Sequence, residues 1–393
     1  MACKWALGGL SVVCGSALLA AGLYGAAGAV ELAYVTNFES NEVSVVDISR
    51  SRVRTVIETG QHPMGVAALR DGSRVYVTNF DDATVAVIEA ATARVLTRIP
   101  FENRPRAIAA APSGDRVFVV ALDTLAVIDT RTNTVAERIA VHGGPEGIGV
   151  LPDGSRVYLA SRVDSSVIVV DTASNAIIAT IPVGHGPDGG GPLSFAAQPD
   201  GSRVYVTNRF SDTVSVIDPE DNVVLTDIAV RHNPTGIAIL PDGSRLYVAH
   251  LFGGAVSVVD TATNQEVGAI AVGERLTGVG TVQDGSRVLV ASAENNTLSI
   301  IDTRTNAVAA VVPVGANPVA YGQFIATVAQ PRDCVGDCDA DGRVLVDELL
   351  TGVRIALAEL PLAACAALDR GNGRITIEEL TGAVHHALVG CPQ

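Results

Sequence analysis

The chain has 393 residues with a formal net charge of −15, from 42 acidic and 27 basic residues. A nucleic-acid backbone would be repelled on average by such a charge, so we expect no nucleic-acid partner. Hydrophobic residues make up 48 % and charged residues 18 %, which is enough apolar material for a core and argues against disorder. With 39 Gly, 18 Pro and only 4 % aromatic residues, the composition favours short strands and turns over a helical bundle.

The N-terminal segment has the features of a secretory signal peptide. Lys4 is followed by an uncharged, largely apolar run from Trp5 to Ala29, which ends in the cleavage pattern Ala27-Gly28-Ala29. We expect residues 1–29 to be removed and the protein to be exported to the periplasm, the cell surface or the medium. After cleavage no stable membrane insertion is expected. An uncleaved membrane anchor is the alternative, because the run is long enough to span a bilayer.

A turn motif recurs about every 42 residues through the middle of the chain. Asp-Gly-Ser-Arg stands at 71–74, 153–156, 200–203, 242–245 and 284–287, with a permuted form at 113–116. Such a period is typical of propeller blades or of helical arrays. One complete unit contains four short β-branched runs, at 75–79, 84–88, 95–99 and 107–111, and no apolar stripe at helical spacing. The local pattern therefore favours four-stranded blades.

A second turn recurs with an Asp and, four residues later, an Asn. The pairs are Asp129 and Asn133, Asp171 and Asn175, Asp218 and Asn222, Asp260 and Asn264, and Asp302 and Asn306. These carboxylates could be mistaken for repeated acid–base groups. We interpret them as turn caps, because Asp and Asn commonly hydrogen-bond the backbone of a tight turn.

The phase of the repeat predicts a closed ring. The strand at 33–37 begins the series without the strand that precedes it in other units, and the strand near 317–321 ends the series without its partner. Pairing Pro318–Phe324 with Tyr34–Asn37 would complete seven blades of four strands and remove the open sheet edges. The predicted fold is therefore an all-β seven-bladed propeller with strand-swapped closure over residues 30–326.

The repeated strands resemble those of the YVTN-repeat β-propeller family. The tetrapeptide Tyr-Val-Thr-Asn stands at 34–37, 76–79 and 205–208, and Val43 to Asp47 and Val214 to Asp218 match the strand that follows it. The resemblance covers about residues 33–326, although four blades depart from the tetrapeptide. It implies the propeller fold and an exported or surface location, and little about a reaction.

Histidines gather in the loops that should form one face of the propeller. Loops that precede the innermost strands and loops that follow the Tyr strands share this face, the mouth of the channel, where propellers usually bind ligands. Five histidines fall in these positions: His62, His142, His185, His232 and His250. Imidazoles can bind a metal or move protons near neutral pH, although a solvated rim is the simpler interpretation.

Arginines and phenylalanines come from the same loops. The arginines are Arg104, Arg106, Arg162, Arg209, Arg231 and Arg275. They predict a locally basic mouth suited to an anionic ligand, with Arg231 beside His232 as a ligand candidate. Four phenylalanines follow the Tyr strands, at Phe38, Phe80, Phe210 and Phe252, and we expect them to pack within or between blades.

The C-terminal segment 333–393, after a linker at 327–332, contains a twelve-residue calcium-loop pattern. Carboxylates stand at loop positions 1, 3 and 5, a Gly at 6, a backbone carbonyl at 7 and a Glu at 12. The predicted ligands are Asp337, Asp339, Asp341, the Arg343 carbonyl and Glu348. A second copy lies 31 residues later and places Leu368 and Arg370 at positions 1 and 3, so we expect one calcium site.

Each loop is followed by an amphipathic run, at 347–357 and 378–388, and the pair resembles EF-hand and dockerin modules. The resemblance implies a small α-helical domain. Four cysteines of this segment are disulfide candidates in an exported chain: Cys334, Cys338, Cys365 and Cys391. Their three possible connectivities are not distinguished by the sequence.

The leading functional hypothesis is an exported, monomeric and non-enzymatic binding protein. Its partner would be a protein, an anionic small molecule or a polysaccharide, held by a propeller with a calcium-stabilised appendage. The alternative is a hydrolase of lactonase type, or a metal site, at the channel mouth. No acid pair or nucleophile motif in the sequence supports the alternative directly.

Overall fold

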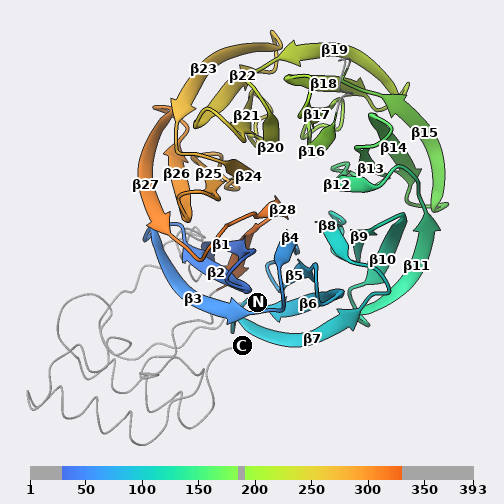
Figure 1. Cartoon of the computed structure of the whole chain (residues 1–393), viewed down its shortest axis with the longest axis vertical. Coiled ribbons are helices and arrows are strands. Elements are labelled where there is room, and N and C mark those ends of the chain that lie inside the picture. Colours follow the sequence, from blue (N-terminus) through green and yellow to red (C-terminus); the bar gives the residue numbers. More distant parts are fainter. Residues whose placement is uncertain (1–28, 185–190, 330–393) are drawn as a thin grey trace, which may run out of the picture.

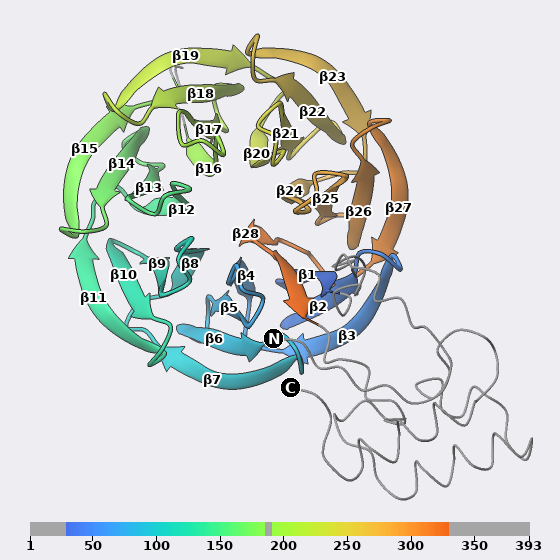
Figure 2. The same cartoon turned by 180° about the vertical axis from the view of Figure 1, so that it is seen from behind.

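The computed structural model describes residues 29–184 and 191–329. The predicted signal peptide, the calcium module with its four cysteines, and His185 lie outside the described residues. Within them, seven sheets stand around a central channel like the blades of a propeller (Figures 1 and 2). The seven-bladed all-β fold is therefore confirmed.

The strands follow one another in this order: β1 (Ala29–Asn37), β2 (Glu42–Asp47), β3 (Arg52–Glu58), β4 (Pro63–Ala68), β5 (Arg74–Asn79), β6 (Thr84–Glu89), β7 (Arg94–Pro100), β8 (Pro105–Ala110), β9 (Arg116–Ala121), β10 (Thr124–Asp129), β11 (Thr134–Ala140), β12 (Pro145–Val150), β13 (Arg156–Ser161), β14 (Ser166–Asp171), β15 (Ala176–Pro182), β16 (Pro192–Ala197), β17 (Val204–Asn208), β18 (Thr213–Asp218), β19 (Val223–Ala229), β20 (Pro234–Ile239), β21 (Arg245–His250), β22 (Ala255–Asp260), β23 (Gln265–Ala271), β24 (Leu276–Thr281), β25 (Arg287–Ser292), β26 (Thr297–Asp302), β27 (Ala307–Pro313), β28 (Tyr321–Gln323) and β29 (Ile325–Ala329). Six blades are antiparallel meanders of four consecutive strands, beginning with β4, β8, β12, β16, β20 and β24 at the channel.

The repeated Asp and Asn residues form the turns that the sequence predicts. Asp129 Oδ1 accepts hydrogen bonds from the backbone N–H groups of Arg131 and Thr132, at 2.9 and 2.8 Å. Asn133 adopts the left-handed conformation with φ of 54°, as do the Asn residues of the four other units. The hydrogen bond from Thr132 N–H is the main reason why the pKa of Asp129 is lowered. These carboxylates therefore cap turns by accepting backbone hydrogen bonds, as predicted.

The Tyr-Val-Thr-Asn strands link neighbouring blades. Tyr34 and Tyr76 are fully buried, and the Tyr76 hydroxyl donates to Asn133 Oδ1 of the next blade at 2.7 Å. The hydroxyl of Thr78 donates to the Arg106 carbonyl on the next innermost strand at 2.8 Å. Thr36 and Thr207 make the same bond, to the carbonyls of Met64 and Thr235. The repeat thus supplies both an apolar core between blades and a polar link across it.

The ring closes through the two ends of the described chain. β29 pairs antiparallel with β1, from Ile325 opposite Ala33 to Ala329 opposite Ala29, and so completes the blade β29-β1-β2-β3. Strand-swapped closure is confirmed. The closing strand runs to Ala329, past the predicted propeller boundary at 326.

The register predicted for the closing strand is wrong. We expected Pro318–Phe324 to pair with Tyr34–Asn37, but the two segments meet only at their ends: Val319 N–H donates to the Thr36 carbonyl beside the bridge from Pro318 to Asn37, and Tyr34 N–H donates to the Phe324 carbonyl, before regular pairing begins at Ile325. In the blade of β4 the matching interval runs from Pro63 to Ala68, so the closing strand carries two extra residues. They divert the chain into the channel, where β28 pairs in parallel with β4.

We refer to residues 320–324 as the strap. Ala320 and Gly322 have positive φ values of 47° and 108°, conformations that turn the strap away from β1. A Cβ atom on Gly322 would lie 2.6 Å from the Val66 carbonyl oxygen, so only glycine fits beside β4. The side-chain amide of Gln323 accepts a hydrogen bond from the Ala110 N–H at 3.2 Å and fixes the strap on β8.

The closure can be tested by truncation. A chain ending at Ala316 lacks β28 and β29, leaves β1 and the last blade with open edges, and is expected to aggregate or lose its folded monomer. A chain ending at Ala329 keeps the closing strand and serves as the matched control. Size-exclusion chromatography and thermal melting compare the two. An unchanged melting temperature and a monomeric state for the shorter chain would refute the closure argument.

Candidate functional site

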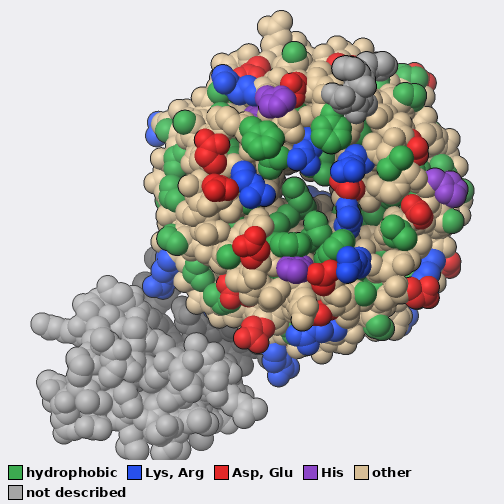
Figure 3. Space-filling view, in the orientation of Figure 1, with side chains coloured by type: hydrophobic (Ala, Val, Ile, Leu, Met, Phe, Trp, Pro, Cys, Tyr) green, Lys and Arg blue, Asp and Glu red, His purple; other side chains and the backbone are tan. Residues whose placement is uncertain are grey.

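The innermost strands begin on one face of the propeller, which we call the mouth face. Figure 3 shows basic side chains gathered around the central opening on this face, with apolar side chains visible inside the opening. The loops that carry His62, His142, His232 and His250 all belong to it, because each precedes an innermost strand or follows the strand paired with it. The predicted grouping of these residues on one face is therefore observed.

His62 belongs to a compact polar cluster. Its Nδ1 pairs with the Asp81 carboxylate, which also binds Arg104 Nη2 at 3.2 Å. The imidazole stacks on Phe38, with ring centroids 4.3 Å apart and planes inclined by 13°. Arg104 lies over the ring of Phe80 at 5.0 Å. The cluster holds His62 in one orientation, with Nδ1 committed to the carboxylate.

His232 repeats part of this arrangement on another blade. Its Nδ1 lies 2.9 Å from an Asp212 carboxylate oxygen, and its ring lies 6.3 Å from that of Phe252. The His232 hydrogen bond contributes to the lowered pKa of Asp212, against the opposing effect of burial. His142 is exposed in the loop before β12 and lies on a separate blade.

His250 is buried and has a structural role. It occupies the slot of Asn37 and Asn208, whose amides donate to Ser44 and Ser215 at 2.8 and 2.7 Å. His250 Nε2 lies 2.8 Å from the matching Ser257 hydroxyl, and Nδ1 lies 3.3 Å from the His232 carbonyl. Since a carbonyl can only accept, Nδ1 carries the proton and Nε2 accepts from Ser257. Burial lowers the pKa of His250, so the neutral form is favoured.

The arginines of the mouth have acidic or amide neighbours on adjacent loops. Glu146 accepts from Arg106 at 2.6 Å and also faces Arg162 at 3.9 Å. Arg275 pairs with Glu294 at 3.6 Å, and Arg209 Nε donates to Asn233 Oδ1 at 3.1 Å. The remaining candidate, Arg231, turns outward to Glu266 on β23 at 3.0 Å.

The opening keeps a positive balance despite these pairs. Among the described mouth residues, the four arginines Arg106, Arg162, Arg209 and Arg275 share two carboxylates, Glu146 and Glu294, and the amide of Asn233. The acids reduce the locally basic mouth that the sequence predicts to a modest positive surplus.

The phenylalanines of the mouth are more exposed than predicted. Phe210 and Phe252 are 41 % and 52 % exposed, and Arg209 lies over the Phe210 ring at 5.8 Å. Packing between blades therefore does not account for these two rings. They provide apolar surface beside the cationic groups of the rim.

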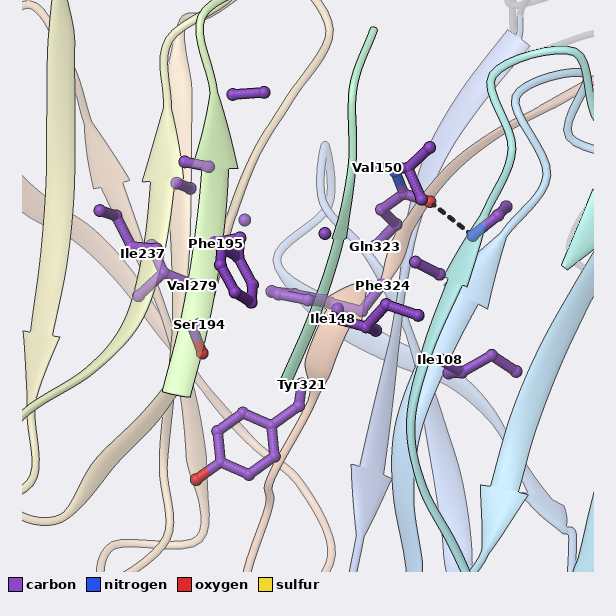
Figure 4. A pocket seen from close by; sticks show the side chains of 18 of the residues that line it. Ile108, Ile148, Val150, Ser194, Phe195, Ile237, Val279, Tyr321, Gln323 and Phe324 are labelled. Atoms are coloured by element: carbon purple, nitrogen blue, oxygen red, sulfur yellow. Dashed lines mark hydrogen bonds between the residues drawn. The ribbon is translucent and has the colours of Figure 1, made fainter. Parts of the chain in front are cut away.

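Tyr321 is a residue of the site that sequence analysis misses. The strap carries it into the channel, and its ring lies at one end of the group of side chains in Figure 4, with Val150 and Gln323 at the other end. Because β12 runs from Pro145 at the mouth to Val150, the Tyr321 end is the mouth end. Burial raises the pKa of its hydroxyl, with smaller opposing effects of the nearby Arg209 and Arg275. The hydroxyl thus stays protonated and can donate.

Within the described part of the chain, no group of three or more His, Cys, Asp or Glu side chains is placed to hold a metal ion. Three blades carry the described mouth histidines: His62 precedes β4, His142 precedes β12, and His232 and His250 share the blade that begins with β20. In residues 29–184 and 191–329, no helix is long and apolar enough to cross a membrane.

Comparison with known proteins identifies the fold alone. No protein-family model matches the chain, and no curated protein matches its sequence. Among solved structures, hydrazine synthase of Kuenenia stuttgartiensis is similar with a TM-score of 0.59 and 20 % identity, over 66 % of this chain and 88 % of that one. A functionally unknown protein of Desulfotomaculum acetoxidans gives a TM-score of 0.65 and 15 % identity, over 75 % of this chain and 100 % of its own.

The structural role of His250 leads to a prediction about stability and pH. His250→Asn restores the amide found in other blades and should change the free energy of unfolding by less than about 1 kcal/mol, whereas His250→Ala should cost about 1–3 kcal/mol. Since the folded-state pKa lies below the usual 6.5, the unfolded chain takes up the proton first as the pH falls. The stabilisation is therefore complete above about pH 6.5 and declines below it.

Denaturant unfolding of the wild type, His250→Asn and His250→Ala between pH 7.5 and 5 measures both effects. The Asn variant should lose part of the pH dependence. Equal losses in the Asn and Ala variants, or an unchanged pH profile, would contradict the assignment of a buried neutral imidazole.

Proposed function

We propose that this protein is an exported, non-enzymatic binding protein that holds an anionic ligand at the mouth of its propeller. The observation that carries the proposal is the ring of arginines around the opening, flanked by the exposed rings of Phe210 and Phe252. Arginine beside an aromatic ring combines charge, directed hydrogen bonds and apolar contact, which suits a ligand with acidic groups on an apolar framework. Membership of the YVTN-repeat family and export from the cell are parts of the same proposal.

The engagement of the mouth carboxylates supports binding over catalysis. Asp81, Glu146 and Asp212 are each held by a basic side chain of the rim. Such pairs fix the shape of the rim and orient their partners. The His62–Asp81 pair favours a hydrolase of lactonase type as a second candidate, because a carboxylate at Nδ1 orients an imidazole as a base. Lactone turnover that disappears in His62→Gln would support it.

The anion site can be tested with a polyanion and its neutral counterpart. Dextran sulfate should bind the purified propeller and uncharged dextran should not, with affinity falling as salt increases. Replacing both Arg209 and Arg275 by Gln should weaken binding about thirtyfold, since each removes roughly 1 kcal/mol of charge-assisted contact.

The matched control is the double variant Arg131→Gln and Arg304→Gln. It removes the same formal charge from exposed turns away from the mouth. Calorimetric titration should show wild-type binding for this control. Equal weakening of both double variants would indicate a general charge effect and would contradict a site at the mouth.

We further propose that the C-terminal module binds one calcium ion through Asp337, Asp339, Asp341, the Arg343 carbonyl and Glu348. Clustered carboxylates repel one another without a cation, and binding stabilises the folded form by mass action. Calorimetric titration should give one site, which Glu348→Ala abolishes and Glu379→Ala in the second copy leaves intact. A stoichiometry of two would show that the second loop is functional, and the absence of binding would refute the calcium assignment.

A further inference from the structure

The channel widens beneath Tyr321 into a chamber of about 510 Å³. Innermost strands from six blades and the strap line it, and its size falls within the range of small-molecule sites. Its walls come mainly from the innermost strands, and it meets the rim at Glu146, which lines both. The anion site proposed above uses only the loops in front of it.

The walls of the chamber are mainly apolar. Ile108, Ile148, Val150, Phe195, Ile237 and Phe324 line it, as Figure 4 shows. Ile148, Val150 and Phe195 keep part of their surface exposed to the channel. Water against such side chains is displaced favourably by an apolar group, and the free energy gained grows with the area covered.

The shape of the chamber depends on two glycines opposite bulky rings. A Cβ atom on Gly149 would lie 2.6 Å from Phe195 Cβ, and one on Gly280 would lie 2.9 Å from Phe324 Cε1. Both rings therefore lie close against β12 and β24 instead of filling the centre. This arrangement leaves the middle of the channel open.

The two ends of the chamber differ in chemistry. At the mouth end lie the Tyr321 hydroxyl and the Glu146 carboxylate, which Arg106 pairs at 2.6 Å, with Arg209 and Arg275 in the electrostatic surroundings of Tyr321. Farther along the channel, Ser194 lies among the apolar side chains. A molecule that satisfies both regions carries a negative head group at the mouth and an apolar body beneath it.

We infer that the channel binds a small amphipathic anion, with a carboxylate or sulfonate at Tyr321, Arg209 and Arg275 and an acyl or aromatic body in the chamber. The head-group contacts rest on the proposed function, the anion site at the mouth. The assignment of the apolar chamber as a ligand site does not depend on that function. Tyr321 lies between the two regions, donates to the head group and lets the body pass beside its ring.

Two fluorescent probes separate these two parts. The anionic probe 1-anilinonaphthalene-8-sulfonate and the uncharged N-phenyl-1-naphthylamine should each bind the full chain at one saturable site. Val150→Trp and, independently, Ile239→Trp fill the chamber from different strands and should weaken both probes at least tenfold. Val311→Trp on the outer strand β27, where Val311 is 53 % exposed, is the control and should bind both as the wild type does.

Head-group variants complete the design. Replacing Arg209 and Arg275 by Gln, or Tyr321 by Phe, should weaken the sulfonate probe several-fold and leave the uncharged probe unchanged. Decanoate should displace the sulfonate probe, and acetate should not.

The results test the apolar chamber and the head-group site separately. Unchanged binding of both probes in the two chamber variants, or no saturable binding in the wild type, would overturn the chamber as a ligand site. If the chamber variants weaken only the uncharged probe, the chamber and the head-group region do not bind the two parts of one ligand, and the combined site is wrong. If the arginine variants leave the sulfonate probe unaffected, the proposed anion site fails while the chamber remains supported.

Discussion

The pairing of β29 with β1 is the constraint on which the rest of the structure depends. Six blades are local meanders, and each blade packs between the two blades beside it in the ring. Without the antiparallel ladder from Ile325 to Ala329, the first and last blades would both expose apolar faces and unpaired edges. The mouth loops converge on one opening only because the ring is closed. The arrangement of the mouth loops therefore depends on the strand pairing between the two ends of the propeller.

The links between blades explain why this fold could be predicted from the sequence. The Thr hydroxyl and the buried Tyr of the repeated strand have partners one blade away, as for Thr78 with the Arg106 carbonyl and Tyr76 with Asn133. These partners recur with the same period as the residues themselves. The turn residues are equally local, since Asp129 bonds the backbone two and three residues ahead. Periodic and local interactions leave a visible pattern, and both were predicted.

The contents of the channel could not be predicted because they break the period. Tyr321 reaches the channel through two extra residues in a strand that otherwise resembles its equivalents, and Gly322 gave the only local signal of a departure. The acids of the mouth were missed for another reason. Glu146 on β12 meets Arg106 on β8 of the neighbouring blade and Arg162 in the loop after β13, and neither contact appears as a repeated motif in the sequence. The exposure of Phe210 and Phe252 likewise depends on the geometry of the rim, and the repeat pattern in the sequence does not indicate it.

The pairing of charges at the rim has a consequence for selectivity. An unpaired ring of arginines would attract any anion, whereas here Arg106 is already committed to Glu146 at 2.6 Å, and Arg209 is held by the neutral amide of Asn233. A ligand competes least where the existing partner is uncharged, so Arg209 offers the most favourable contact for an incoming head group. Arg209 also stands within the electrostatic surroundings of Tyr321, which lines the apolar chamber. In the proposed site, charge pairing would therefore direct an anion away from the outer rim and toward the channel, where its apolar part would meet the chamber.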